Sequence, residues 1–314
     1  MLSHNPLLRS GIRYLNLHSW VQIFLVYESK KEGMKKRFAI KIAYLGQNYH
    51  GFQRQKEGIQ TVEGTILETL LQQKIIDNIR SARYSAAGRT DQGVNALGQV
   101  IAFDAVRDKF CLEELNANLP DDIFAWGISQ VPSIFNARRD AILRIYRYFC
   151  RYKNENIGLL TEALKRLKGT HDFKKLCKKP DPLPSGYQKS TVLTLETAKV
   201  THHKRNAVLE FEFASRSFLW YQVRKMVSLV LQIGAEDLSM NIIDELLDPE
   251  IPLLPGGIKP APPEGLVLYD VLYEPNVSFQ KIQKKTLVAL PLERRLDSYT
   301  ALLSVITAMK KNIL

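Results

Sequence analysis

Apolar and polar residues alternate along the first half of the chain with two different periods. Residues 38–45 (FAIKIAYL) repeat with the period of two that is typical of a half-buried strand. Residues 62–74 instead place apolar side chains every three or four positions, which indicates a helix face, and Thr61 is the candidate N-cap. Further segments are predicted as strands (83–87, 98–105 and 123–131) and as one short helix (112–119). The first half is therefore expected to be mixed α and β, with too few helices for a wholly parallel sheet.

The second half repeats this order of elements. Residues 142–152 (ILRIYRYFCRY) form a long strand-like run, and residues 159–168 form a helix that Gly169 ends. Later segments are predicted as a Pro-rich loop (178–189), two paired strands (191–201 and 207–213), an apolar helix (219–233) and a final strand (265–273). Each half thus contains a strand, a helix and two more strands. This similarity predicts an α+β fold with a loose internal duplication.

The two ends of the chain differ from these halves. The halves correspond to residues 34–140 and 141–274, and residues 275–314 are expected to add one or two helices. Residues 1–33 show no periodicity or cap that ties them to the fold, which leaves two interpretations: an organelle transit peptide, or a translation start at Met34. No apolar run approaches the length of a membrane span, so no membrane partner is expected.

Charge and cysteine content narrow the class of protein. The chain has 44 Lys and Arg against 32 Asp and Glu, a formal net charge of +12, which favours a polyanionic partner such as nucleic acid. Membranes and acidic proteins attract the same charge. The three cysteines form no C-x-x-C pair, which fits a reducing compartment and predicts a cytoplasmic protein. Neighbouring His202 and His203 would point to opposite faces of a strand, so no metal site is predicted.

The segment GRTDQGV (88–94) follows a predicted strand and places a carboxylate between two glycines. Asp-x-Gly is common turn chemistry, in which the aspartate caps its own backbone. The functional alternative is that the glycines let a substrate approach the backbone while the loop presents Asp91 into a cleft. This segment alone leaves both interpretations open.

Two further segments combine arginine with aromatic or apolar residues. In RIYRY, the period of two places Tyr146 and Tyr148 on one face of a strand and Arg147 on the other. Aromatic rings beside cations suit unpaired nucleic acid, although a half-buried strand with surface arginines gives the same pattern. In FLWYQVRKMV, Arg224 has apolar neighbours and must either reach solvent or meet a carboxylate, ideally in a two-pronged fork.

Together these segments resemble the TruA family of tRNA pseudouridine synthases from about Phe38 to Tyr273. The resemblance is carried by YHGFQRQ (49–55), GRTDQGVNALGQV (88–100), NANLPDDI (116–123), FNAR (135–138), IYRYF (145–149), GTHDF (169–173), FLWYQVRKM (218–226) and PEGL (263–266). Each motif alone is weak, whereas their order and spacing are specific. The short connection after Tyr152 is most similar to archaeal members.

The resemblance implies a pseudouridine synthase fold, in which two similar α/β halves share an extended, mainly antiparallel sheet with a central cleft. It also implies a homodimer that acts on tRNA. The implied reaction converts uridine to pseudouridine in the anticodon stem-loop, at positions 38–40, without a cofactor or metal. The target base must leave its stack to be reached. Whether the enzyme attacks C1′ or C6 of the nucleoside stays open.

Site residues follow from the positions that match the family's motifs. The resemblance implies that Asp91 is the nucleophile and that Arg224 is the basic residue paired with it. It further implies that Tyr146 stacks on the base or accepts the C5 proton.

RNA contacts are expected from four other residues. Arg89 and Arg54 are expected to touch RNA or help to flip the base. Arg147 and Tyr148 are predicted RNA contacts because bases stack on aromatic rings while phosphates meet arginines.

Two alternatives and one departure accompany this hypothesis. The protein could be an RNA-binding member that has lost catalysis, although it retains Asp91, Tyr146 and Arg224 together. It could also be an active synthase that modifies other sites in tRNA or another RNA. The departure is Asn95, which stands where many members have histidine and leaves the hydrogen bonding behind the catalytic loop undetermined.

Overall fold

The computed structural model describes residues 35–56, 58–178, 190–252 and 256–313. The N-terminal half contains β1 (Lys36–Tyr44), α2 (Val62–Gln72), β2 (Ser85–Ala86), β3 (Asn95–Ala105), α3 (Leu112–Asn116) and β4 (Ile123–Gln130). The C-terminal half contains β5 (Ala141–Arg151), α4 (Ile157–Leu167), β6 (Gly169–Asp172), β7 (Val192–His203), β8 (Val208–Ser215), α5 (Gln222–Gly234), α6 (Ile242–Leu247) and β9 (Leu266–Tyr273). They are followed by β10 (Gln280–Lys281) and α7 (Thr286–Ile313).

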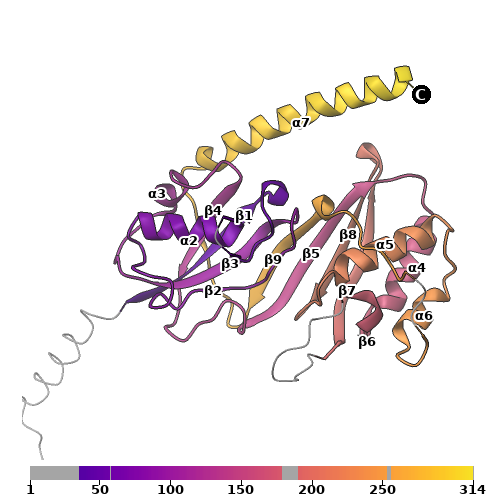
Figure 1. Ribbon diagram of the computed structural model, residues 1–314, viewed down its shortest axis with the longest axis horizontal. Helices are drawn as coiled ribbons and strands as arrows, with labels where there is room; N and C mark the ends of the chain where they lie inside the picture. Colours follow the sequence, from indigo (N-terminus) through magenta and orange to yellow (C-terminus); the bar gives the residue numbers. More distant parts are fainter. Residues whose placement is uncertain (1–34, 57, 179–189, 253–255, 314) are drawn as a thin grey trace, which may run out of the picture.

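One sheet joins the two halves. Its strand order is β10-β4-β1-β3-β9-β5-β8-β7-β6, with β2 beside β3. Only the β3–β9 pair is parallel among the described strand pairs. Figure 1 shows the two halves side by side, with α2 and α3 on the first and α4, α5 and α6 on the second. The predicted α+β fold with a shared, mainly antiparallel sheet is confirmed.

The local sequence explains why the N-terminal elements form. Along β1, buried side chains such as Ile40 and Ile42 occupy the core, as the period of two predicts. The α2 helix begins after Thr61, whose hydroxyl accepts a hydrogen bond from the Gly64 amide at 3.2 Å. This cap satisfies one of the free amides of the first turn. Ile66 and Leu70 then bury the apolar face of the helix against the sheet.

In the C-terminal half, α5 begins later than predicted. The helix was expected from residue 219 but begins at Gln222, because Tyr221 has a positive φ of 65° and cannot continue a right-handed helix. The Gln222 side chain accepts a hydrogen bond from the Leu219 amide at 2.8 Å and closes the turn. Residues 218–221 therefore form a turn that lines a cleft.

The β9 strand is the element that unites the halves. Although it comes late in the chain, it lies between β3 of the first half and β5 of the second. Gly98 on β3 permits this approach, since a Cβ atom there would lie 2.5 Å from the Tyr269 carbonyl oxygen. Any residue larger than glycine at this position would push the halves apart.

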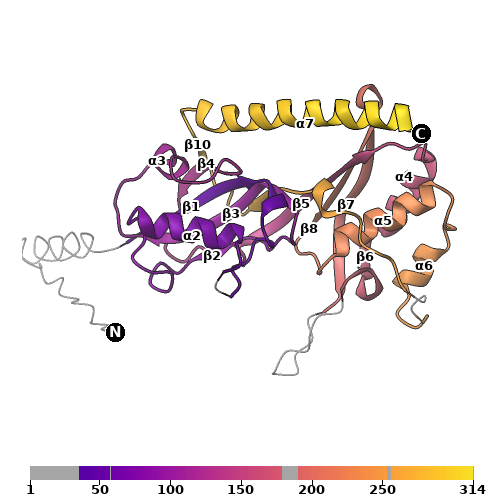
Figure 2. The same cartoon turned by 45° about the horizontal axis from the view of Figure 1, so that its top comes forward.

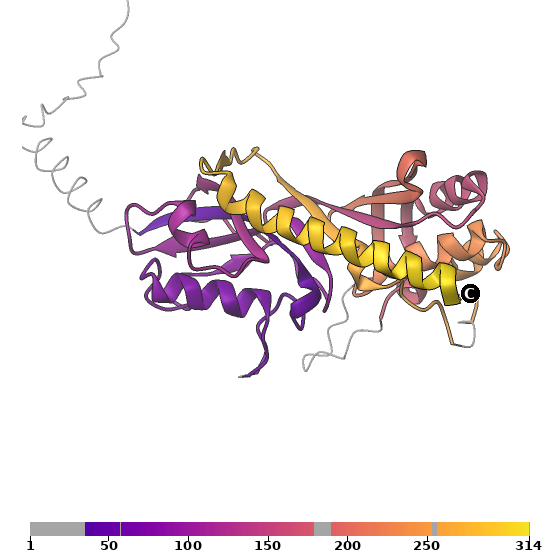
Figure 3. The same cartoon turned by 90° about the horizontal axis from the view of Figure 1, so that it is seen from above.

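Several elements differ from the prediction. The sequence pattern missed β6, α6 and β10, which are too short to establish a period. The C-terminal region contains β10 and a single long helix, α7, which extends from the N-terminal half toward the C-terminal half (Figures 2 and 3). It contacts the body through Arg295–Asp122 at 3.6 Å and Tyr299–Gln47 at 2.9 Å. None of the described helices is long and apolar enough to cross a membrane.

Two predictions concern residues outside the described part of the chain. These are the N-terminal segment 1–33 with its candidate start at Met34, and most of the loop expected at residues 178–189.

Candidate active site

A cleft of about 1350 Å³ lies between the halves of the sheet. Both halves line it: the loop 88–94 and the segment 136–141 from the first, and β5 with the turn 216–224 from the second. Four of the seven predicted site residues line this cleft, namely Asp91, Tyr146, Arg224 and Arg89. The structure thus brings together the three residues for which catalytic roles are expected.

Hydrogen bonds from two strands fix the loop that carries Asp91. The fully buried Gln99 of β3 binds both backbone groups of Gly88, accepting from its amide at 3.1 Å and donating to its carbonyl at 2.8 Å. The Tyr44 hydroxyl of β1 shares a hydrogen bond of 2.7 Å with the Thr90 hydroxyl. The residues on both sides of Arg89 are therefore held by the core of the sheet, which orients Asp91.

Two glycines allow this loop to pack closely. Gly93 has a φ of +79°, and a Cβ atom there would lie 2.9 Å from the ring of Pro263. Gly51 has a φ of +94° and lies against the Thr90 carbonyl oxygen, which accepts a hydrogen bond from the Phe52 amide at 3.0 Å. Glycine is needed at both positions for a left-handed backbone and for close packing.

Asn95 supports the same loop from behind. Its side chain accepts a hydrogen bond from the Gly46 amide at 2.9 Å and donates to the Glu264 carbonyl at 2.8 Å. Asn95 therefore joins the start of β3 to two neighbouring loops.

Asp91 faces Arg224 across the cleft. Arg224 Nη1 lies 3.5 Å from Asp91 Oδ2, and the two side chains are 11% and 23% exposed. Burial raises the pKa of Asp91 above its ordinary value, while Arg224, Trp220 and Lys178 each oppose that rise. The carboxylate is thus partly desolvated yet flanked by groups that stabilise its charge.

The geometry of this pair differs from a fork. Arg224 Nη1 approaches Asp91 Oδ2 no closer than 3.5 Å, beyond the usual length of a charge-assisted hydrogen bond, while Nε donates a hydrogen bond of 2.6 Å to the Ala261 carbonyl. The expected two-pronged contact is therefore wrong for this state of the protein. Arg224 instead connects the carboxylate to the segment that precedes β9.

Tyr146 lies beside this pair on β5. Its ring packs edge-on against Phe218, with ring centroids 5.1 Å apart. Burial raises the pKa of Tyr146 to about 12, with a smaller rise from Asp91 that is opposed by Arg144. The phenol is therefore neutral at physiological pH and offers a flat aromatic surface inside the cleft.

Three predicted RNA contacts lie elsewhere. Arg147 points away from Tyr146, as the period of two predicts, and forms ion pairs of 2.9 Å with Glu210 and Glu212. Tyr148 is buried, and Arg54 is exposed outside the residues that line the cleft.

Arg144 is a cleft residue that the sequence analysis missed. It is 8% exposed, and its guanidinium donates to the carbonyls of Ala87 (3.0 and 2.7 Å), Arg138 (2.9 Å) and Arg216. It thus joins three segments that line the cleft. Its even spacing from Tyr146 on the same strand is the signal that could have revealed it.

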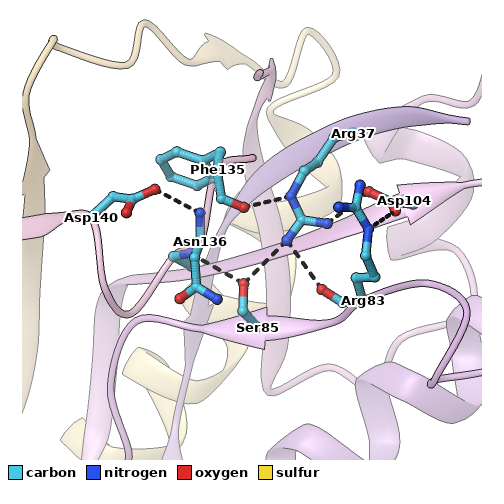
Figure 4. A network of polar contacts seen from close by, with 8 residues as sticks. Arg37, Arg83, Ser85, Asp104, Phe135, Asn136 and Asp140 are labelled. Atoms are coloured by element: carbon cyan, nitrogen blue, oxygen red, sulfur yellow. Dashed lines mark hydrogen bonds and ion pairs between the residues drawn. The ribbon is translucent and has the colours of Figure 1, made fainter. Parts of the chain in front are cut away.

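The segment 135–140 on one wall of the cleft is held by polar contacts (Figure 4). The buried Arg37 donates to the Phe135 carbonyl at 2.6 Å and forms an ion pair of 2.7 Å with Asp104. The Ser85 hydroxyl accepts a hydrogen bond from the Ala137 amide at 3.1 Å. The backbone of this wall is therefore fixed, and it presents two exposed arginines, Arg138 and Arg139.

Metal-binding chemistry has no visible site in the described ranges. They contain no group of three or more His, Cys, Asp or Glu side chains that could hold a metal ion. His203 pairs with Glu210 at 2.7 Å, whereas His202 packs against Tyr152. The two neighbouring histidines thus have different partners.

Comparison with known proteins identifies the family. Residues 163–274 match the sequence family described as tRNA pseudouridine synthase. The chain is 39% identical to tRNA pseudouridine synthase A of Methanosarcina acetivorans, over 77% of this chain and 87% of that protein. It is 37% identical to the protein of the same name from Archaeoglobus fulgidus, over 78% and 86%.

A solved structure of a Cbf5-Nop10-Gar1 complex is a more distant match. It has a TM-score of 0.29 and 8% identity, over 62% of this chain and 54% of that one, and adds nothing to the assignment. The relatives define the protein as a member of the pseudouridine synthase class. Within that class, the chain belongs to the tRNA pseudouridine synthase A (TruA) family. The expected resemblance is confirmed.

Proposed function

We propose that this protein isomerises uridine to pseudouridine at positions 38–40 in the anticodon stem-loop of tRNA, with Asp91 as the nucleophile. The observation that carries the proposal is the Asp91–Arg224 pair, which faces Tyr146 in a cleft of a size that admits a nucleoside. Family membership makes the protein a pseudouridine synthase, an isomerase whose substrate is tRNA. The anticodon site itself rests on the motif resemblance.

The proposed chemistry uses an ionised carboxylate. Asp91 attacks C1′ or C6 of the bound uridine, the N1–C1′ bond breaks, and the uracil turns so that its C5 bonds to C1′. Release of the carboxylate, loss of the C5 proton and protonation of N1 then give pseudouridine, an isomer of the substrate, without consuming water. Arg224 keeps Asp91 ionised in spite of burial, since its charge opposes the raised pKa.

Tyr146 is proposed to stack on the flipped base. Its pKa of about 12 leaves little phenolate at physiological pH, so a resting phenolate does not supply the base that removes the C5 proton. A neutral ring in contact with Phe218 instead supplies a flat apolar surface. Such a surface retains the base while it turns.

We further propose that the protein works as a cytoplasmic homodimer, which follows from the family resemblance and the cysteine usage. Sedimentation of the purified full chain tests the assembly: a monomer at micromolar concentration contradicts it.

The experiment that tests the function maps pseudouridine in unmodified tRNA after incubation with the purified protein. Pseudouridine confined to positions 38–40 is the expected result. Pseudouridine elsewhere in tRNA would support the synthase activity but contradict the proposed positions. No pseudouridine, together with tight tRNA binding, would favour an RNA-binding member without catalysis.

A further inference from the structure

The cleft contains more positive charge than its catalytic pair accounts for. Among the described residues, six arginines line it (Arg89, Arg138, Arg139, Arg144, Arg216 and Arg224), against two acids, Glu63 and Asp91. Asp91 is paired with Arg224, and one Glu63 oxygen accepts a hydrogen bond from the Arg54 amide. The cleft surface away from the catalytic pair therefore carries a cationic excess.

Arg144 organises part of this excess. Three of its four hydrogen bonds reach Ala87 and Arg138, and the fourth reaches the Arg216 carbonyl. A guanidinium has five N–H groups, so one N–H on Nη1 has no partner among the described residues. Because the backbones of Arg138 and Arg216 both bind the same guanidinium, their side chains start on two sides of a buried cation.

This arrangement of like charges favours the binding of an anion. Burial lowers the pKa of Arg144, and the nearby charges of Arg138 and Arg216 lower it further. Throughout the part of the chain that the structure describes, no ion pair joins Arg138, Arg144 or Arg216 to a carboxylate. Each carbonyl bond satisfies a donor but leaves the charge uncompensated. A bound anion would remove the repulsion.

We propose that Arg138 and Arg216, on either side of Arg144, bind an RNA phosphate next to the uridine that enters the cleft. This inference rests on the proposed function, because it places the nucleotide of that reaction. The fixed backbone of residues 135–140 keeps Arg138 in position before RNA arrives. The geometry therefore assigns phosphate binding to Arg138 and Arg216. Arg147, on the opposite face of β5, already forms ion pairs with two carboxylates.

The site also explains how a nucleotide could be held during the reaction. The base must detach from its ribose and turn, so it cannot be held by a rigid contact to its own edge alone. A phosphate bound beside Arg144 fixes the backbone on the sugar side, since Arg144 is two residues from Tyr146 on the same face of β5. The sugar then stays near Asp91 while the base moves.

Binding measurements with an inactive protein test the inference. The Asp91→Asn protein binds unmodified tRNA without turnover, and Arg138→Gln and Arg216→Gln are added to it separately. Each is expected to weaken binding by about tenfold and to lower the slope of log Kd against log salt by about 0.7 to 0.9. Arg205→Gln is the matched control, because Arg205 is exposed and lies at the opposite end of β8 from Arg216. It is expected to change neither quantity.

A chemical change in the RNA makes the test specific. A stem-loop RNA is prepared with one uncharged methylphosphonate beside the target uridine. If Arg216 binds that phosphate, Arg216→Gln weakens binding to the normal RNA by about tenfold but to the modified RNA by less than about twofold. The assignment would be overturned if Arg216→Gln weakened binding to the normal RNA and to RNAs with a methylphosphonate on either side of the uridine by the same factor.

The outcomes separate this inference from the proposed function. If the wild-type protein makes pseudouridine and both arginine variants have the tRNA affinity and salt dependence of Arg205→Gln, the proposed phosphate site is wrong and the proposed function stands. If the wild-type protein makes no pseudouridine at any tRNA site, the proposed function is wrong. A charge-dependent loss in Arg138→Gln and Arg216→Gln would still support an RNA phosphate at this position.

Discussion

The two faces of β5 use arginine in opposite ways. On the reverse face, Arg147 lies between Glu210 and Glu212 and stacks on the Tyr269 ring, 3.7 Å from its centroid. Lys199 adds a second cation, 2.8 Å from Glu212. On the cleft face, the Arg144 guanidinium binds only backbone carbonyl oxygens among the residues that the structure describes.

This difference indicates where RNA binds. Opposite charges that face each other across neighbouring strands stabilise a sheet and leave little net field. Arginines without carboxylates do the reverse, because they raise the local potential and attract an anion. The same side-chain type thus has a structural role on one face of the strand and is available for a ligand on the other.

Removing the charge opposite Asp91 should give the largest effect on the cleft side. Arg224→Ala is expected to lower kcat/KM by at least about a hundredfold, as for other preorganised electrostatic groups in active sites. Arg224→Lys should recover only part of the activity, because an ammonium cannot donate to Ala261 and face Asp91 with the same geometry. Rates of pseudouridine formation measure both. Full activity of Arg224→Ala would show that Arg224 has no role in catalysis.

The same pair should couple in stability. Urea unfolding of Asp91→Asn, Arg224→Ala and the double variant is expected to give a coupling of about 1–2 kcal/mol, below the value for a fully buried pair. The reduction follows from the single 3.5 Å contact and the partial exposure of Asp91. Additive free energies of unfolding would show that the two residues do not act as partners.

Equivalent substitutions on the two faces of β5 test the comparison itself. Arg144→Gln is expected to destabilise the protein by about 2–4 kcal/mol, because several buried carbonyls lose their donor. Arg147→Gln should cost about 1 kcal/mol or less, since the Arg147 side chain is 27% exposed and partly solvated. Its tRNA affinity should stay unchanged. A loss of affinity in Arg147→Gln as large as in Arg216→Gln would break the distinction between the faces.

The smallest expected effect concerns pH. Turnover requires ionised Asp91, and its raised pKa means that activity falls on acidification at a higher pH than for a free aspartate. Lys178 opposes this rise and lies 3.8 Å from the centroid of the Trp220 ring. Lys178→Met should therefore move the acid limb of the pH–rate profile to higher pH. Lys204→Met, at an exposed turn, is the control. An identical shift of the pH–rate profile in both variants would show that Lys178 has no specific effect on Asp91.

The sequence predicted the parts of the fold that depend on local periodicity. Alternation in β1 and β5 assigned their faces, and Thr61 marked the start of α2. The predicted start of α5 was wrong because Tyr221 adopts a left-handed φ of 65°, which the intrinsic preference of tyrosine does not indicate. Short elements such as β6 and α6 have too few residues to show a period.

The candidate site was predictable only in part for a related reason. Motif positions located Asp91, Tyr146 and Arg224, and the structure brings all three to one cleft. The partners of Arg144 could not be read from the sequence, because carbonyl oxygens are present at every residue and carry no sequence signal. The two carboxylates around Arg147 come from β8, so their pairing depends on the strand register.

The central claim is that Asp91 is the nucleophile of a tRNA pseudouridine synthase. Its most direct test measures pseudouridine in tRNA after incubation with wild-type protein and with Asp91→Asn, whose identity is verified by mass spectrometry to exclude deamidation. We expect turnover by the wild type, no detectable pseudouridine from Asp91→Asn, and tRNA affinities within about twofold of each other, because the substitution keeps the shape of the side chain. Pseudouridine formation at the wild-type rate by the verified Asp91→Asn protein would contradict the account.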